Sequence, residues 1–131
     1  MLKVILDTNI VISAALSQNG NCANVIGIIT DDEQVQLFIS EEILFEYEEV
    51  LSRKHLNIPD KVQKSIIKSI RKVGLELMPT PSYVSFSDES DRVFYDTAIT
   101  ADAILITGNK KHYPTENFIM TPAEFLQMLG K

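Results

Sequence analysis

Cysteine and histidine, the residues that most often bind zinc or form cross-links, are scarce in this sequence. The single cysteine, Cys22, has no partner for a disulfide within the chain, and the two histidines, His55 and His112, do not form a zinc-binding pattern with it. We expect both histidines to be ordinary surface residues. Any metal ion bound by this protein would therefore have to be held by oxygen ligands.

Long hydrophobic runs are also lacking. No apolar stretch reaches the roughly 18 to 20 residues that span a bilayer, and the N-terminus enters MLKVILD directly, without the charged segment and cleavable apolar region of a signal peptide. We therefore expect a cytoplasmic protein with no membrane contact. Its 131 residues, 45% of them hydrophobic, are enough for one core and too few for two ordinary ones, which predicts a single domain over residues 1–131.

Positive charge is in short supply. Twelve Lys and Arg residues stand against eighteen Asp and Glu residues, and the net charge of −6 disfavours sequence-independent attraction to phosphate backbones without excluding nucleic acid. Most of the basic residues fall in one central stretch, residues 53–72. They either guide RNA toward an acidic site or form the solvent-exposed face of an amphipathic helix, and the helical pattern favours the second interpretation.

Short apolar segments alternate with amphipathic segments along the chain. Strands are predicted at residues 3–6, 35–39, 75–78, 103–107 and 117–120. Helices are predicted at residues 9–17, 22–31, 40–54, 59–73, 90–101 and 122–129. Prolines and serines make residues 79–90 a predicted loop. This alternation predicts an α/β fold with a mainly parallel sheet that is covered by helices on both faces.

An aspartate separates the first two apolar segments. Asp7 directly follows the predicted strand 3–6, at the edge of the sheet where parallel strands end and ligands gather. The alternative is a capping role, in which Asp7, or more readily Asn9, caps the helix that follows. This segment alone leaves both interpretations open.

A second aspartate faces an unexpected direction in the predicted helix 90–101. On a helical wheel of about 100° per residue, Asp91 falls inside the apolar arc and Asp96 falls outside it. The arc is formed by Phe94, Tyr95, Ala98 and Ile99. A charge directed at the core needs a partner, so Asp91 is a candidate functional acid. Capping by Asp88 with help from Asp91 explains the position of Asp91 better than its direction.

Glutamates are abundant in the predicted helix 40–54, and the helical wheel places Glu46 and Glu48 at opposite edges of its apolar arc. Periodicity does not choose between the two. Any single glutamate in such a helix is more often solvated than functional.

A polar turn follows the predicted strand 103–107, where Thr107, Gly108 and Asn109 end an apolar run. Asp7, Asp91 and Asn109 therefore map to one edge of one sheet from three distant parts of the chain. Carboxylates that are crowded without cationic partners repel one another, and a divalent metal ion usually holds such a cluster. Oxygen ligands suit Mg²⁺ or Mn²⁺.

In order, these motifs resemble the PIN domain family, and within it the bacterial VapC-like toxin components. The matching segments are LDTNIVISAAL, Ser40 followed by Glu46 in SEEILFEYEEVL, Asp91 with Ala98 in DESDRVFYDTA, ILITGNKKH and the closing TPAEFL. They span nearly the whole chain in the order of the family.

The resemblance implies a three-layer α/β/α sandwich with a short, mainly parallel central sheet. It also implies a metal-dependent endoribonuclease, often a toxin that a cognate antitoxin protein neutralises. Residue by residue, Asp7, Glu46 and Asp91 match the catalytic, metal-binding acids, which selects Glu46 over Glu48. Further positions that we consider as secondary ligands or supports are Thr8, Asn9, Asp88, Thr107 and Asn109. We expect RNA, an antitoxin and a second copy of the chain as partners.

One residue departs from the family pattern. Many members have an aspartate in the turn after the fourth strand, where this chain has Asn109. A neutral amide keeps an oxygen ligand but removes a charge, which leaves the number of bound ions open. The alternative function is therefore a catalytically weak or inactive PIN fold that binds RNA or protein.

Two other families share the aspartate at the end of a first strand or the general fold class. Haloacid-dehalogenase-like phosphatases place a second aspartate two residues after the first, where this chain has Asn9. Response-regulator receiver domains carry their phosphoacceptor at the end of a middle strand and a lysine at a later strand end, and neither feature is evident here. Both families fit less well.

Overall fold

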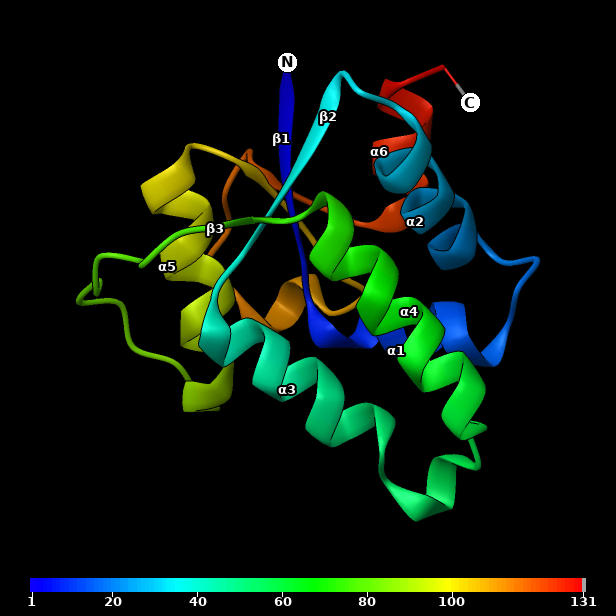
Figure 1. Cartoon of the computed structure of the whole chain (residues 1–131). Coiled ribbons are helices and arrows are strands. Elements are labelled where there is room, and N and C mark those ends of the chain that lie inside the picture. Colours follow the sequence, from blue (N-terminus) through cyan, green and yellow to red (C-terminus); the bar gives the residue numbers. More distant parts are fainter. Residues whose placement is uncertain (131) are drawn as a thin grey trace.

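The structure is a computed structural model that describes residues 1–130, and a five-stranded parallel sheet forms its centre (Figure 1). The strands are β1 (Leu2–Leu6), β2 (Val35–Ile39), β3 (Leu75–Glu76), β4 (Ile104–Ile106) and β5 (Ile119–Met120). They are ordered β3-β2-β1-β4-β5, and each neighbouring pair is parallel. From β1 the chain first adds β2 and β3 on one side of the sheet and then β4 and β5 on the other side. The strand order therefore reverses between β1 and β4.

Helices cover both faces of the sheet, which confirms the predicted α/β fold (Figure 1). On one face α5 (Arg92–Ala101) packs against β1, β2 and β4. The other face is covered by α2 (Asn21–Asp31), α4 (Asp60–Val73) and α6 (Pro122–Met128). At the carboxyl ends of the strands lie α1 (Thr8–Leu16) and α3 (Glu41–Leu51). Three short 3-10 turns are η1 (Lys54–Leu56), η2 (Glu89–Asp91) and η3 (Lys110–His112).

The central strand is buried on both sides. Val4, Ile5 and Leu6 are each 0% exposed although their side chains alternate between the two faces. Close packing also explains the glycine after α4, because a Cβ at Gly74 would lie 2.8 Å from Ile39 Cδ1. The core therefore holds β1 and β2 in fixed positions, and it presents their carboxyl ends to α1 and α3.

The predicted helix 90–101 differs from α5 in its start and in its buried face. Asp91 belongs to η2, and α5 begins at Arg92. Asp96, which the helical wheel placed outside the apolar arc, is 3% exposed, whereas Ile99, placed inside it, is 50% exposed. The wheel was wrong at both positions. Asp96 is buried because the loop between β3 and η2 returns over the side of α5 that carries it.

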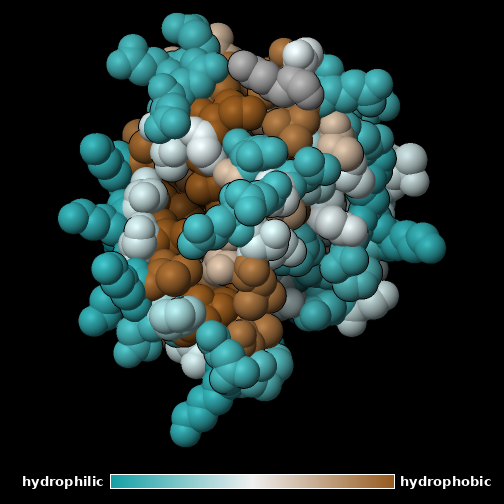
Figure 2. Space-filling model, turned by 90° about the vertical axis from the view of Figure 1, so that its right-hand side faces the viewer, coloured by the Kyte–Doolittle hydropathy of each residue, from teal (hydrophilic) through white to brown (hydrophobic). Residues whose placement is uncertain are grey.

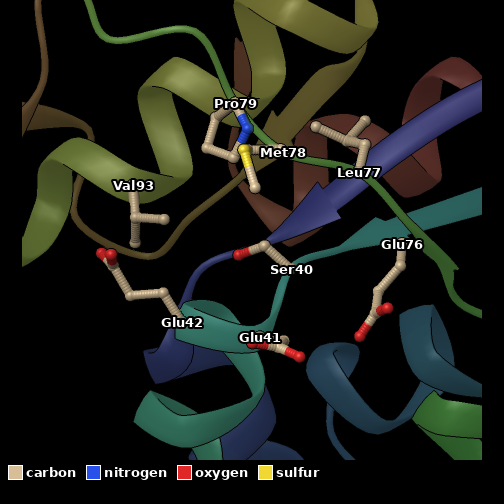
Figure 3. A pocket seen from close by; sticks show the side chains of 8 residues that line it. All are labelled: Ser40, Glu41, Glu42, Glu76, Leu77, Met78, Pro79 and Val93. Carbon is tan, nitrogen blue, oxygen red and sulfur yellow. The ribbon is translucent and has the colours of Figure 1, made fainter.

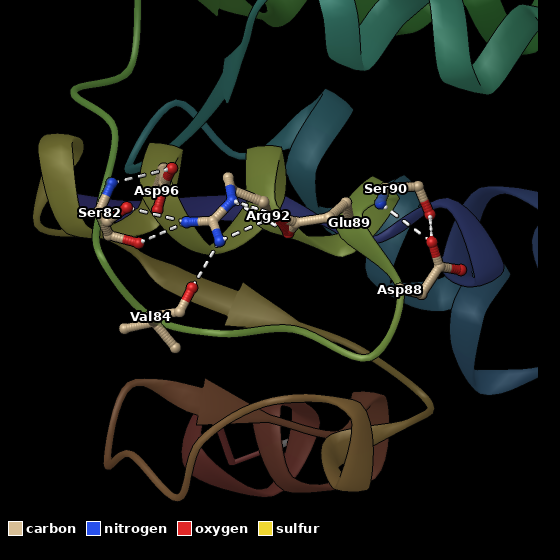
Figure 4. A network of polar contacts seen from close by, with 7 residues as sticks. All are labelled: Ser82, Val84, Asp88, Glu89, Ser90, Arg92 and Asp96. Carbon is tan, nitrogen blue, oxygen red and sulfur yellow. Dashed lines mark hydrogen bonds and ion pairs between the residues drawn. The ribbon is translucent and has the colours of Figure 1, made fainter.

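Hydrogen bonds tie this loop to α5 (Figure 4). The Ser82 N–H donates to Asp96 Oδ2 at 3.2 Å, and the Thr80 N–H donates to Thr100 Oγ1 at 2.9 Å. Arg92 donates from Nη1 to the Ser82 carbonyl at 2.9 Å and forms an ion pair with Glu89 at 3.1 Å. The loop thus has a fixed path that leads to Asp88 and Asp91.

An apolar furrow lies between α2 and α4, on the face opposite α5. Its cavity of about 330 Å³ is lined by Ala14, Ala23, Ile26, Val62 and Ile66, with Gln18, Lys61 and Ser65 at its polar margin. Figure 2, which faces this side, shows a hydrophobic band bordered by hydrophilic side chains. Within residues 1–130, no helix combines the length and the apolar character needed to cross a membrane.

Candidate functional site

Two adjacent strand ends place Asp7 next to Thr107. Leu6 of β1 pairs with Ile106 of β4, so the residues that follow both strands leave the sheet together, where the strand order reverses. Thr107 Oγ1 donates a hydrogen bond to Asp7 Oδ2 at 2.8 Å. Strand register therefore brings a hydroxyl and a carboxylate together from opposite ends of the chain.

The Asp7 carboxylate is buried and anchored through one oxygen. Asp7 is 5% exposed, and the Tyr113 hydroxyl donates to the same Oδ2 atom at 2.9 Å. Burial raises the pKa of Asp7, while the hydrogen bonds from Thr107, Tyr113 and the Thr8 backbone oppose that rise. Because both hydroxyls bond Oδ2, neither of them occupies Oδ1.

Asp7 and Asp91 occupy the N-cap positions of α1 and α5, yet neither side chain makes a capping hydrogen bond. Ser40 and Thr121, by contrast, cap α3 and α6 through their hydroxyl groups. A missing cap costs about 1 kcal/mol of helix stability. The capping alternative thus explains where the two aspartates lie in the sequence, but not what their carboxylates contact.

Tyr47 fixes Glu46 beside the end of β1. Tyr47 is 0% exposed, its hydroxyl donates to the Leu6 carbonyl, and its ring lies 6.3 Å from that of Phe94. The neighbouring Glu46 is partly buried, and burial raises its pKa, as does the charge of Glu49. Glu48 instead pairs with Arg71 on α4 at 2.8 Å.

Asp91 approaches Asp7 from the start of α5. Its side chain is 13% exposed, and burial together with the charges of Asp7 and Asp88 raises its pKa to about 6. His112 Nδ1 lies 3.6 Å from Asp91 Oδ2 and partly opposes this rise. Asp88 differs, since the side chain and backbone of Ser90 donate to it and lower its pKa.

Asp7, Glu46 and Asp91 line one cleft of about 410 Å³, which we call the acidic cleft. The structure brings these three predicted acids together from β1, α3 and the start of α5. The predicted secondary positions Thr8, Asn9, Asp88 and Asn109 also line the acidic cleft. Thr107 is not part of the lining and supports Asp7 from behind.

The sequence did not predict Tyr113 or His112 for the site, and it offered Arg53 only as one of the basic residues 53–72 that could guide RNA. Tyr113 anchors Asp7, Arg53 lines the acidic cleft, and His112 lines it beside Asp91. His112 is exposed, as predicted for a surface residue, and η3 places it on the acidic cleft beside Asp91. The only local signal was the polar GNKKHYP turn itself, which does not reveal that its tyrosine folds back onto a residue 106 positions earlier.

Comparison with known proteins identifies the family. The sequence model of the PIN domain family matches residues 3–111. The chain belongs to the PIN domain family. It is also 28% identical to the uncharacterized protein MJ1680 of Methanocaldococcus jannaschii, over an alignment of 145 residues that covers 99% of this chain and 93% of the relative.

The fold of this PIN domain is similar to a chain in the crystal structure of VapBC2 from Rickettsia felis bound to a DNA fragment from their promoter. The TM-score is 0.62 with 16% sequence identity, and the match covers 91% of this chain and 97% of the other. At this identity the likeness concerns the fold. The PIN family and the α/β fold, both predicted from the sequence, are confirmed.

The turn after β4 packs closely on the start of α1 in this PIN domain. The Gly108 N–H donates to Asn9 Oδ1 at 3.0 Å, and a Cβ at Gly108 would lie 3.3 Å from that oxygen. The Asn109 N–H donates to Thr107 Oγ1 at 3.0 Å, while the residue itself borders the acidic cleft. Asn9 therefore holds the turn in place, and Asn109 is positioned beside the acids.

The acidic cleft is lined by carboxylate, amide and hydroxyl oxygens, the donor types that a hydrated divalent cation uses. Within residues 1–130 no group of three or more Asp, Glu, His or Cys side chains is arranged so that it could hold a metal ion by itself. Mg²⁺ rarely needs such a cage, because it keeps several water molecules and binds one or two carboxylates together with substrate phosphate. The buried Thr8 Oγ1, which has no hydrogen-bond partner, adds an oxygen that could accept from or donate to such water.

A second carboxylate-lined cavity, of about 550 Å³, lies between the start of α3 and the end of β3 (Figure 3). We call it the α3–β3 cavity. Its glutamates, Glu41, Glu42 and Glu76, are all exposed, and Glu42 points toward Val93 and away from the other two. Its other walls are largely apolar. Exposed, separated carboxylates are typical of a solvated surface, so we do not consider this cavity the functional site.

Proposed function

We propose that this PIN domain is a divalent-metal-dependent endoribonuclease that hydrolyses phosphodiester bonds of RNA. Asp7, Glu46 and Asp91 would be its catalytic, metal-binding acids, and Mg²⁺ or Mn²⁺ its ion. One observation carries the proposal: three acids with raised pKa values converge on one cleft where the strand order reverses. Such crowding is costly in a metal-free protein, and a cation in the acidic cleft would compensate it.

Each of the three acids has its own support. Thr107 and Tyr113 hold Asp7 through Oδ2, Tyr47 fixes α3 so that Glu46 faces the cleft, and Asp91 enters from the N-terminus of α5. A bound divalent ion would polarise the scissile phosphate and lower the pKa of an attacking water. The protein side chains would position the ion and the phosphate, so that the water adds to phosphorus as the bond to the leaving oxygen breaks.

We further propose that the protein is the toxin of a toxin–antitoxin pair and has a cognate antitoxin protein as its partner. Two observations support this: the fold is similar to a chain of VapBC2, and the furrow between α2 and α4 offers an apolar surface for a partner. Co-expression with the protein encoded by a neighbouring gene would test it. The proposal requires that this protein co-purifies with the PIN domain and suppresses its RNA cleavage.

The test of the nuclease proposal uses the purified protein and a labelled single-stranded RNA. We expect cleavage in Mg²⁺ or Mn²⁺, no cleavage in EDTA, and loss of cleavage in Asp7→Asn and Asp91→Asn variants that retain their circular dichroism spectrum. Binding of RNA without cleavage under all metal conditions would instead support the binding-module alternative that Asn109 raises. Full cleavage by both variants would refute the proposed site.

A further inference from the structure

Arg53 holds a distinctive place on the acidic cleft. Among the residues that line the cleft, Arg53 is the only lysine or arginine, while four carboxylates, from Asp7, Glu46, Asp88 and Asp91, share the lining. Arg53 follows directly after α3 and its C-cap residue, Ser52. A permanent positive charge thus lies at the same cleft as the proposed metal-binding acids.

The Arg53 guanidinium is held only weakly by the protein. Its Nη2 atom lies 3.0 Å from Glu49 Oε2, and both side chains are about half-exposed, at 50% and 46%. An exposed ion pair of this kind contributes little stability. Glu49 accepts hydrogen bonds from Nε and Nη2 of Arg53. Within residues 1–130 no hydrogen bond involves Nη1, so its two N–H groups remain for another acceptor.

Four other basic residues of the central stretch line different cavities. Lys64, Lys68 and Arg71 line a different cavity, between α3 and α4, and Lys61 lies at the furrow between α2 and α4. All four side chains are exposed, which agrees with the solvent-exposed helix face predicted for residues 59–73. The structure therefore separates Arg53 from these four basic residues, with which the sequence grouped it.

We propose that Arg53 binds a phosphate of the RNA chain next to the scissile one and so positions the substrate across the acidic cleft. This inference rests on the proposed nuclease function. A cation bound by the acids would neutralise the scissile phosphate, but a neighbouring phosphate would still meet the excess negative charge of the cleft. A guanidinium forms two parallel hydrogen bonds with a phosphate, which fixes the direction of the chain as well as its distance.

The binding test compares two arginines in an Asp91→Asn background that slows cleavage. Arg71 is a matched control, since it is 55% exposed and pairs with Glu48 at 2.8 Å, much as Arg53 pairs with Glu49. We measure the anisotropy of a fluorescent single-stranded RNA in Mg²⁺ over a range of KCl concentrations. Arg53→Gln should weaken binding about tenfold and lower the salt slope by about 0.7. Arg71→Gln should change affinity less than about twofold.

Two further measurements separate positioning from a general charge effect. Arg53→Lys should restore the salt slope but only part of the affinity, because ammonium lacks the planar fork. In the protein with all three acids, Arg53→Gln should raise KM and leave kcat nearly unchanged. Unchanged binding in Arg53→Gln, or equal losses in Arg53→Gln and Arg71→Gln, would overturn the inference while RNA cleavage by the parent still stood. A parent that neither binds nor cleaves RNA would overturn the proposed function as well.

Discussion

The acidic cleft and the α3–β3 cavity both display several carboxylates, but their acids are held differently. In the cleft, Asp7 is 5% exposed and accepts hydrogen bonds from two hydroxyl groups. In the larger α3–β3 cavity, Glu41, Glu42 and Glu76 are exposed to solvent. A buried carboxylate lowers stability unless it is compensated, whereas an exposed one costs almost nothing. Burial and anchoring, rather than cavity size or acid count, therefore distinguish the candidate site.

The largest expected effect is on RNA cleavage. Asp7→Asn should reduce metal-dependent cleavage by about a hundredfold or more, because it replaces a proposed carboxylate ligand with a neutral amide. The hydroxyl groups of Thr107 and Tyr113, which hold the carboxylate in place, would then support a weaker ligand. Glu42→Gln in the α3–β3 cavity should leave the rate unchanged. Single-turnover assays of both variants, with thermal melts to verify folding, measure the contrast. A comparable loss in Glu42→Gln would remove the distinction between the two cavities.

Glu46 and Glu48 on α3 allow a second comparison between an acid of the cleft and an acid outside it. Glu46→Gln should impair cleavage by about tenfold or more, because Glu46 lines the acidic cleft. Glu48→Gln should lose only the exposed ion pair with Arg71 and keep its activity. The same cleavage assay decides between them, and the opposite result would mean that α3 presents a different residue to the metal ion.

Removal of one anchoring hydroxyl should have a smaller effect. Tyr113→Phe deletes the 2.9 Å hydrogen bond to Asp7 Oδ2 and leaves Thr107 as the remaining hydroxyl that holds this oxygen. Loss of such a supporting contact weakens metal affinity by about tenfold. Calorimetric titration with Mn²⁺ measures this change. Tyr95→Phe is the control, since the Tyr95 hydroxyl donates to Glu116 and not to Asp7; an equal loss in both variants would point to a general packing effect.

The smallest expected effect is on the pH dependence of stability. Burial raises the pKa of Asp91 from 3.8 to about 6, so the folded protein retains a proton that the unfolded chain releases between these values. The stability that this retained proton contributes is fully present below pH 3.8 and is lost as pH rises through about 6. Asp91→Asn avoids the loss and should stabilise the metal-free protein near neutral pH, by about 1 kcal/mol.

Chemical denaturation of the metal-free parent and of Asp91→Asn at several pH values measures the difference. The gain in the free energy of unfolding of Asp91→Asn over the parent should be small near pH 4 and should grow toward pH 7. Glu76→Gln serves as a control for the removal of an exposed carboxylate. A gain that stays constant with pH would show that ionisation of Asp91 does not strain the metal-free cleft.

Local patterns predicted most of the fold. Residues 35–39 form β2 at the predicted bounds, and α2, α4 and α6 end within one residue of theirs. Apolar periodicity, prolines at helix starts and the Ser40 cap are all local signals. The strands predicted at 75–78 and 117–120 are only two residues long. Only Leu75 and Glu76 pair with β2, and only Ile119 and Met120 pair with β4.

Long-range contacts set the limit of prediction. The strand ends suggested that Asp7, Asp91 and Asn109 share one edge, and the structure places all three on the acidic cleft. The wheel failed for Asp96 because a distant loop covers it, and the Tyr113 anchor depends on a contact across 106 positions. Periodicity describes one element at a time and carries no information on such contacts.

The most direct test of the account is a Mn²⁺ titration, followed by calorimetry, of the parent, Asp7→Asn and Glu42→Gln. We predict that the parent and Glu42→Gln bind Mn²⁺ alike and that Asp7→Asn loses most of this binding, because the ion would lie in the acidic cleft. Undiminished binding by Asp7→Asn together with loss in Glu42→Gln would place the ion in the α3–β3 cavity and contradict the account.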